Sequence, residues 1–585
     1  MHTGYRNLFI ALTLTLIAAL PRFYELGSLS FYGDEETTAF PARSLAEDQG
    51  PRMPSGMPYH RALPHTWLNA LCARFFGIDS AFSYRVSAAV LGTLTVPLLF
   101  LLAGAFFGWQ IALIAALLLA VSEWHIITSR EARMYAPFLF LYVATGFALW
   151  RWAVTAYWPY LVAATVLFCL TVATHTLGIF VVLFALTPIA IAGWAQVRAW
   201  RLIAFALSAG AAAHLYSQRF VLGEYDRWRA AASGVIQTEN GSGSDAVASL
   251  PTLLLSDASP ALLIGASIGA ALGAWAGWLN RSTNGEPDTL LRVAGQLTLA
   301  VCGTALLCTG RWYGAALVLL LWLLMLPLGG QTAIARSRGT TIAALAIAAV
   351  WTMVSIGQLG LSAAIKVLFG FPYPYLAFLA SMFPAIMALF AAATLWLALR
   401  RPASLESPLR ACVFTVILPI VAVGVVSKWG GVRYVIQIYP FLLLVSAFAL
   451  LGIVRAVGQR TRLWQERTSV AAAAAIAVSG VLGGHGIPQA VAAATLTHGD
   501  KVSQLSFGYP FYPDHQGPGE FVRQRLVDGD IVVAEDALQQ RWYVGKVDYW
   551  LRDPVNSRQF LYRSPAGYLR DIYVSSTALT PELMD

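Results

Sequence analysis

The stretch FSYRVSAAVLGTLTVPLLFLLAGAFFG (residues 82–108) carries one charged side chain, Arg85, near its start and none in the rest. An apolar run of this length can cross a hydrocarbon core of roughly 30 Å as an α-helix. Lipid offers no hydrogen-bond partners to the backbone, and a helix satisfies its own backbone groups. The stretch therefore predicts a membrane-spanning helix.

Similar runs recur along the chain of 585 residues, which is 58% hydrophobic and 12% charged. A soluble protein would carry roughly 25% charged residues. We therefore expect a polytopic α-helical membrane protein with about 13–15 spans. The first run has no small-residue cleavage site before PRFYEL, so we expect it to remain as a span. The expected spans lie near residues 7–26, 84–106, 110–127, 134–152, 158–174, 176–195, 202–216, 259–279, 293–310, 312–329, 340–360, 376–398, 411–427, 435–453 and 468–484.

The net charge of +9 indicates membrane topology and not a nucleic-acid partner, because the arginines gather in short connectors such as QVRAWR and RAVGQRTRLWQER. Such connectors are typical of cytoplasmic loops. This places the N-terminus inside and the C-terminal tail outside, as expected for a multi-pass protein of the inner membrane. The five scattered cysteines form neither a disulfide framework nor a metal-binding pattern.

Three segments are not expected to span the membrane. Within a membrane domain over residues 1–484, residues 27–83 form a first outer loop, whose segment LPHTWLNALCARFFG is expected to lie along the interface as a helix. Residues 217–258 form a second large outer loop. The tail at 495–585 regains polar residues, and its order of helix, Asp-Gly turn, buried strand and helix predicts a small extracytoplasmic α/β domain.

The first outer loop contains three consecutive acids in SLSFYGDEETTAF (residues 28–40). A carboxylate just outside the membrane, Asp34 or Glu35, is a candidate general base that takes a proton from an acceptor. The alternative is a solvated loop that also caps a helix, and Glu36 keeps that interpretation.

A second candidate stretch is EWHIITSREARMYA (residues 123–136). Arg130 and Arg133 are three residues apart, so at the start of a helix they would share a face and suit a phosphate. Glu131 and Tyr135 are further candidates for the same site. Alternatively, the arginines extend to lipid headgroups with Glu131 as a local partner.

The stretch MPYHRALPHTWLNAL (residues 57–71) places His60, Arg61 and His65 before the interfacial helix. Arg61 is a candidate phosphate contact. The histidines could hold zinc, but a third ligand is not evident, so no metal is expected.

Two further sites stand at expected outer boundaries. His175 in TVATHTLGIF is a candidate, although an isolated histidine there is more often part of hydrogen-bonded packing. Lys428 and Arg433 flank a Gly-Gly pair that allows a tight bend in SKWGGVRYVIQIYPFLLL. Arg433 is a candidate phosphate contact and Lys428 a further candidate residue, and the alternative for both is a role as interfacial anchors.

The order GDE, SREARMYA and VRYVIQIYP resembles the GT-C membrane glycosyltransferases, and in particular the glycosyltransferase 39-like family of protein O-mannosyltransferases and lipid A aminoarabinose transferases. The run at 82–108 resembles the second span of that family, and GDIVVAEDALQQRWYVGKVDYWL (529–551) resembles its extracytoplasmic tail. The resemblance covers both ends of the chain and is weak across about residues 200–410.

The resemblance implies a GT-C fold and a sugar donor on a polyprenyl phosphate, used on the outer face without a cofactor. Asp34 corresponds to the first-loop catalytic acid of the family, with Glu35 beside it. Arg130 falls at a donor-phosphate contact. Arg61 corresponds approximately to a phosphate-binding residue of the aminoarabinose transferases, although HRALPH here replaces a basic residue followed by two prolines.

We therefore predict an inverting glycosyltransferase, in which arginines neutralise the leaving phosphate and a carboxylate activates the acceptor. The alternatives are a transporter or flippase, or a ligase, for lipid-linked glycans. A transporter tends to show inverted repeats and charges at the membrane midplane. The acceptor stays open between protein, glycolipid and glycan.

Overall fold

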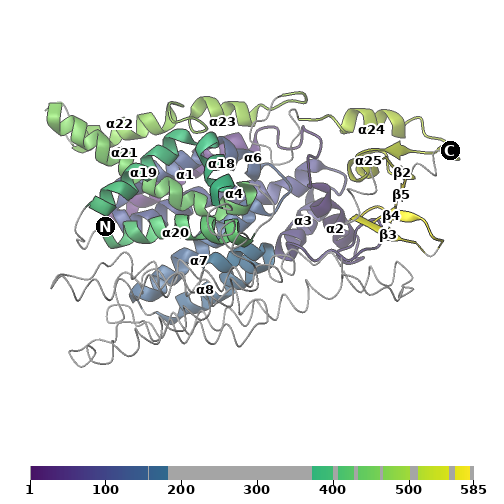
Figure 1. The fold of residues 1–585 in the computed structure, drawn as a ribbon, viewed down its shortest axis with the longest axis horizontal. Coiled ribbons are helices and arrows are strands. Elements are labelled where there is room, and N and C mark those ends of the chain that lie inside the picture. Colours follow the sequence, from purple (N-terminus) through teal and green to yellow (C-terminus); the bar gives the residue numbers. More distant parts are fainter. Residues whose placement is uncertain are drawn as a thin grey trace, which may run out of the picture.

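A computed structural model describes residues 2–155, 157–181, 372–399, 406–426, 432–461, 466–500, 512–551, 560–564 and 566–579. The molecule is elongated, with a bundle of helices toward the N-terminus and a small sheet domain at the C-terminus (Figure 1). We call the end of the bundle that adjoins the sheet domain the loop end. Lys428, the 217–258 loop and the spans expected between 202 and 360 lie outside the described residues.

The bundle consists of apolar helices. Three helices of the described residues are long and apolar enough to cross a membrane, and a bent pair would add a fourth. The helices of the bundle are α1 (His2–Phe23), α4 (Ala81–Phe107), α5 (Trp109–Ala120), α7 (Tyr135–Thr155), α8 (Trp158–Thr174), α18 (Pro372–Met382), α19 (Pro384–Leu399), α20 (Glu406–Val426), α21 (Tyr439–Thr461) and α22 (Glu466–Val478), with 3₁₀ turns η1 (Thr176–Phe180) and η4 (Val432–Ile438).

Two of the expected spans are broken in the structure, and the predictions of single straight helices there were wrong. The 376–398 span bends by 115° between α18 and α19, because Pro384 disfavours helical backbone at the residue before it. The 110–127 span ends at Ala120, and a separate short helix α6 (Glu123–Ser129) follows. Ser122 starts α6, since its Oγ accepts a hydrogen bond from the backbone N–H of His125 at 3.3 Å.

The first loop contains two helices, α2 (Glu36–Ala46) and α3 (Leu63–Phe76). Helix α3 buries small or polar residues such as Thr66, Asn69 and Ala73, while Trp67, Leu71 and Phe75 are exposed. The exposed residues repeat every fourth position, so they form one apolar stripe. A stripe of this kind fits a helix that lies against lipid.

The C-terminal region begins with α23 (Ile487–Ala494) and continues with α24 (Gln516–Arg523) and α25 (Ala537–Tyr543). Its sheet has the order β1-β2-β5-β4-β3, with β1 (Val533–Ala534), β2 (Tyr549–Trp550) and β5 (Thr577–Ala578) parallel. The strands β3 (Leu561–Arg563) and β4 (Leu569–Asp571) add an antiparallel hairpin. Strand β1 lies where a buried strand was expected, but it has two residues and Val533 is exposed.

The sheet domain packs directly on the first loop. Met53, Met57 and Tyr59 share a buried cluster with Ile572 of the domain. Ser55 adds two hydrogen bonds, from its N–H to the carbonyl of Tyr573 at 2.9 Å and from its Oγ to the carbonyl of Ile572 at 2.6 Å. The first loop is therefore held between the helical bundle and the sheet domain.

Candidate active site

Asp34 lies at the loop end, just before α2, and two arginines from distant parts of the chain meet its carboxylate. Its Oδ2 is 3.4 Å from Nη1 of Arg433 and 3.6 Å from Nη2 of Arg133. The Asp34 side chain is 37% exposed, whereas that of Arg133 is buried. The three residues come from the first loop, the turn before α7 and η4, so folding assembles a site that no single motif contains.

The two arginines are held differently. Nη1 of Arg133 donates to the carbonyl of Asp34 at 2.9 Å and to the hydroxyls of Thr37 at 2.6 Å and Thr38 at 3.1 Å. Burial lowers the pKa of Arg133, but Asp34 and Tyr135 outweigh it and raise this pKa above its ordinary value. The guanidinium of Arg433 lies 5.2 Å from the ring centroid of Tyr434, and the Arg433 side chain is partly exposed. Both arginines are thus cations, and Arg433 is the more accessible one.

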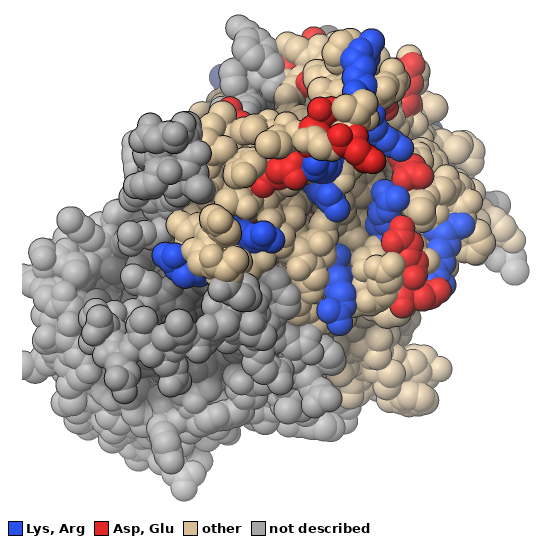
Figure 2. All heavy atoms as spheres, turned by 90° about the vertical axis from the view of Figure 1, so that its right-hand side faces the viewer, with Lys and Arg blue, Asp and Glu red and all other residues tan. Residues whose placement is uncertain are grey.

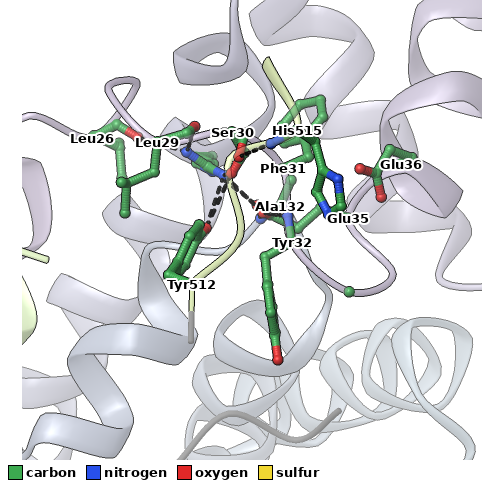
Figure 3. Close-up of polar contacts among 12 residues, drawn as sticks. Leu26, Leu29, Ser30, Phe31, Tyr32, Glu35, Glu36, Ala132, Tyr512 and His515 are labelled. Carbon is green, nitrogen blue, oxygen red and sulfur yellow. Dashed lines mark hydrogen bonds and ion pairs between the residues drawn. The ribbon is translucent and has the colours of Figure 1, made fainter. Parts of the chain in front are cut away.

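Glu35 is fully buried, and both of its carboxylate oxygens are occupied (Figure 3). Arg85 of α4 donates from Nε to Oε1 at 2.8 Å and from Nη2 to Oε2 at 2.7 Å. The backbone N–H of Ala132 donates to Oε1 at 2.6 Å, and that of Tyr32 donates to Oε2 at 2.8 Å. A carboxylate that accepts four hydrogen bonds in the protein interior is poorly placed to take a proton from a substrate. The geometry therefore favours a positioning role for Glu35 over the catalytic role expected from the sequence.

Glu36 corrects the expectation of a solvated acid, because its side chain is fully buried. Among the described residues its Oε1 has no hydrogen-bond partner, and its Oε2 lies 3.4 Å from Nε2 of Gln539 in α25. Burial, together with the charges of Glu35 and Asp34, raises the pKa of Glu36 well above its ordinary value of 4.5. The three consecutive acids thus have three different environments.

Arg130 and Arg133 do not share a helix face, which corrects the prediction from their spacing. Helix α6 ends at Ser129 and α7 begins at Tyr135, so the arginines lie in a turn between them. The Nη1 of Arg130 donates to the carbonyls of Pro21 and Tyr24 at the end of α1, at 3.0 and 2.5 Å. Burial lowers the pKa of Arg130 to about 10. Arg133 alone of this pair reaches Asp34.

Glu131 and Tyr135 lie beside Arg433 and line, with Thr128, a cavity of about 10 Å³. This volume is roughly that needed for one water molecule. Glu131 is half-buried, and burial together with the Glu35 charge raises the pKa of its carboxyl to about 8. His175 packs its ring 5.1 Å from that of Phe138 and 5.8 Å from that of Tyr135. His175 therefore belongs to the packed wall of the site.

The candidates before α3 lie in two settings. Arg61 is exposed and His60 half-buried in the turn that leads into α3. His65 is buried, its Nε2 is 3.2 Å from Nδ2 of Asn69, and burial lowers its pKa to about 3. Its ring is therefore neutral. Within the described ranges, no three His, Cys, Asp or Glu side chains lie close enough together to hold a metal.

Sequence reasoning missed the residues of the C-terminal region that hold the loop of Asp34. The hydroxyl of Tyr543 accepts the N–H of Phe31 at 2.7 Å, and Nε2 of Gln539 donates to the carbonyl of Gly33 at 2.9 Å. The hydroxyl of Tyr512 donates to the carbonyl of Ser30 at 3.1 Å. These contacts join residues about 480 to 510 positions apart, and no local pattern marks them.

Comparison with known proteins supports the family resemblance. Residues 61–226 match the family model of dolichyl-phosphate-mannose-protein mannosyltransferases. No curated protein matches the chain significantly.

Among solved structures, the oligosaccharyltransferase AglB of Archaeoglobus fulgidus, in complex with an inhibitory peptide and a dolichol-phosphate, is 14% identical with a TM-score of 0.53. The match covers 93% of this chain and 64% of AglB. The apo form of the Archaeoglobus fulgidus enzyme gives a TM-score of 0.54 at 14% identity, with the same coverage. ArnT of Cupriavidus metallidurans in the apo state is 13% identical with a TM-score of 0.37, over 95% of this chain and 89% of ArnT.

The family match and the likeness to AglB confirm the predicted resemblance to the GT-C membrane glycosyltransferases. At 14% identity the likeness to AglB shows the fold alone, and the chain spans less than two thirds of the length of AglB. The apolar helices and this fold make the chain a membrane protein.

The buried Glu35–Arg85 pair predicts a large structural effect. Arg85→Met would leave the Glu35 charge unpaired and lower the free energy of unfolding by about 3–5 kcal/mol. The double variant Arg85→Met/Glu35→Gln should recover part of this loss, since no unpaired charge remains. Melting temperatures of the purified protein measure both effects. Arg74→Met, which breaks the exposed pair with Asp48, is the matched control with an expected loss of about 0–1 kcal/mol. Equal losses for Arg85→Met and Arg74→Met would contradict this account.

The raised pKa of Glu36 predicts a pH-dependent stability. The folded state favours neutral Glu36, so this contribution is present below the ordinary pKa of 4.5 and is lost as pH rises through the raised pKa. Glu36→Gln stays neutral, and its melting temperature should rise relative to that of the wild type between pH 5 and pH 9, roughly the range above the ordinary carboxyl pKa. Asp528→Asn, at an exposed turn, is the control. A melting-temperature difference between Glu36→Gln and the wild type that does not change with pH would show that Glu36 is charged in the folded protein.

Proposed function

We propose that this chain, with its GT-C fold, is an inverting glycosyltransferase that moves a sugar from a polyprenyl-phosphate donor to an acceptor on the outer face of the membrane. The family that matches residues 61–226 is described by a dolichyl-phosphate-mannose donor. AglB was solved with a dolichol-phosphate. Both descriptions support a lipid phosphate as the carrier of the sugar.

The observation that carries the proposal is the meeting of a partly exposed carboxylate, Asp34, with the two arginines Arg133 and Arg433. Transfer from a lipid phosphate needs a base for the acceptor and positive charge for the leaving group. The cluster of Asp34, Arg133 and Arg433 supplies both the base and the positive charge. Arg433 suits the phosphate best, because its side chain is partly exposed while that of Arg133 is buried, and its contact to Asp34 is long at 3.4 Å.

The reaction follows from this arrangement. Asp34 takes the proton of the acceptor hydroxyl or amine while the acceptor oxygen or nitrogen bonds to the anomeric carbon. The bond from that carbon to the phosphate oxygen breaks, and the electron pair leaves with the polyprenyl phosphate. Arg433 and Arg133 neutralise the charge that develops on this phosphate. A single in-line displacement inverts the anomeric centre.

The surrounding residues take supporting roles in the proposal. Glu35 fixes the loop that carries Asp34, and Arg130 fixes the end of α1. Arg61, exposed before the lipid-facing helix α3, is a further candidate contact to the donor phosphate, as is Lys428. Glu131 and Tyr135 lie beside Arg433, so they would border the donor sugar once its phosphate is bound there.

The loop end is proposed to face the periplasm. The end of α21 and the start of α22 lie at the N-terminal end of the bundle, away from the sheet domain (Figure 1). There Arg455 pairs with Glu466 and donates to Oε1 of Gln110 at 2.8 Å. This end carries one of the basic connectors typical of the cytoplasmic side. The site and the C-terminal domain would then both be extracytoplasmic.

The proposal predicts that Asp34→Asn lowers turnover of a polyprenyl-phosphate sugar by about 10²–10⁴-fold, because the general base is lost. The melting temperature should change little, since the Asp34 side chain is 37% exposed. Radiolabelled sugar transfer by the purified enzyme in lipid nanodiscs measures turnover. Undiminished transfer by a folded Asp34→Asn protein would exclude Asp34 as the base.

A further inference from the structure

A cavity of about 760 Å³ lies between the first loop and the C-terminal domain. Its volume is within the usual range of small-molecule sites. Helix α2 and residues 47–56 form one side, and α24 and α25 form the other. The proposed reaction uses none of the charged residues that line it. They are Arg43, Glu47, Arg52, Asp79, Glu520, Arg523 and Arg541.

The lining of this cavity excludes a lipid tail as its ligand. Positively charged guanidinium groups and negatively charged carboxylates line the same space. Basic and acidic side chains are also interspersed over this end of the molecule (Figure 2). A polyprenyl chain would need an apolar groove. A simple anion would be opposed by Glu47 and Glu520. The ligand therefore offers both hydrogen-bond donors and acceptors.

One wall of the cavity is an ordered aromatic surface. The indole of Trp542 packs against Phe31 and Phe40, with ring centroids 5.1 Å away in each case. The guanidinium of Arg43 lies 5.6 Å from the Trp542 ring and also pairs with Glu47 at 3.1 Å and Asp79 at 3.2 Å. These contacts fix the polar groups beside the ring before any ligand arrives, which lowers the cost of binding.

We propose that this cavity binds a saccharide, the non-reacting part of a glycan acceptor. Sugar hydroxyls donate and accept, so they match the mixed guanidinium and carboxylate lining. Trp542, half-buried in the lining, adds apolar ring surface beside these polar groups, which suits the C–H groups of a pyranose. The inference rests on the proposed function, because it supplies the acceptor for the reaction at Asp34.

Helix α25 connects this cavity with the reaction site. Gln539 donates to the carbonyl of Gly33, next to Asp34, while Trp542 and Tyr543 line the cavity. Residues 539 and 543 are about one helical turn apart, roughly 6 Å along the axis. A glycan in the cavity can therefore extend its acceptor hydroxyl past α25 toward Asp34.

The test is binding of saccharides without any donor. The full-length protein in lipid nanodiscs is titrated with maltotriose, chitotriose, mannotriose and trigalacturonic acid, and with a Ser/Thr-containing hexapeptide, by saturation-transfer NMR. At least one trisaccharide should bind, and the hexapeptide should not. The double variant Arg52→Ala/Arg523→Ala should weaken saccharide binding about tenfold, as expected for the loss of one or two charged hydrogen bonds.

The matched control is Arg525→Ala, which removes an arginine two positions from Arg523 whose guanidinium stacks on Phe521 at 3.7 Å. Binding that is unchanged in the double variant, or equally weakened in the control, overturns the inference, as does binding of the hexapeptide alone. Sugar transfer dependent on Asp34 without any saccharide binding would leave the proposed function intact and reject this cavity. Saccharide binding without transfer from a polyprenyl-phosphate donor would support the saccharide site in this cavity and reject the proposed function.

Discussion

The buried ion pair between Glu35 and Arg85 is the interaction on which the rest of the site depends. It joins the first loop to α4 through two charged hydrogen bonds, at 2.8 and 2.7 Å. The same carboxylate binds the N–H of Ala132, in the turn that carries Arg133. Arg85 also donates to the carbonyls of Leu29 and Ser30 at 2.8 Å. One buried pair thus fixes the two segments that bring Asp34 and Arg133 together.

The C-terminal domain completes this frame from the other side. Tyr543, Gln539 and Tyr512 bind the backbone of residues 30–33, which leads directly to Asp34. The loop is therefore restrained at its backbone, while the carboxylate of Asp34 remains partly exposed. Preorganisation of this kind is what a charged reaction site requires, because its groups do not have to reorganise as charge develops. In the proposed function the domain is therefore part of the site, because it holds the loop that carries Asp34.

The sequence predicts the class of fold well and the site in part. Apolar length alone identifies α4, and the motifs identify Asp34, Arg133 and Arg433 as candidates, since charges at span ends stand out against hydrocarbon. The sequence alone could not assign different roles to Glu35 and Asp34, because the two residues differ in burial and not in the kind of side chain. The spacing of Arg130 and Arg133 gave a wrong prediction, since α6 ends at Ser129, before both of them. Gln539 and Tyr543 were beyond prediction, because contacts across about 500 residues leave no local pattern.

The central claim is that Arg433 and Arg133 bind the donor phosphate beside Asp34. A cryo-electron microscopy map of the protein with a bound polyprenyl phosphate tests it most directly. We predict phosphate density within hydrogen-bond distance of the Arg433 guanidinium, with the Asp34 carboxylate next to it and the lipid chain running between helices of the bundle. Phosphate density at a different part of the chain, with Arg433 still paired to Asp34, would contradict the account.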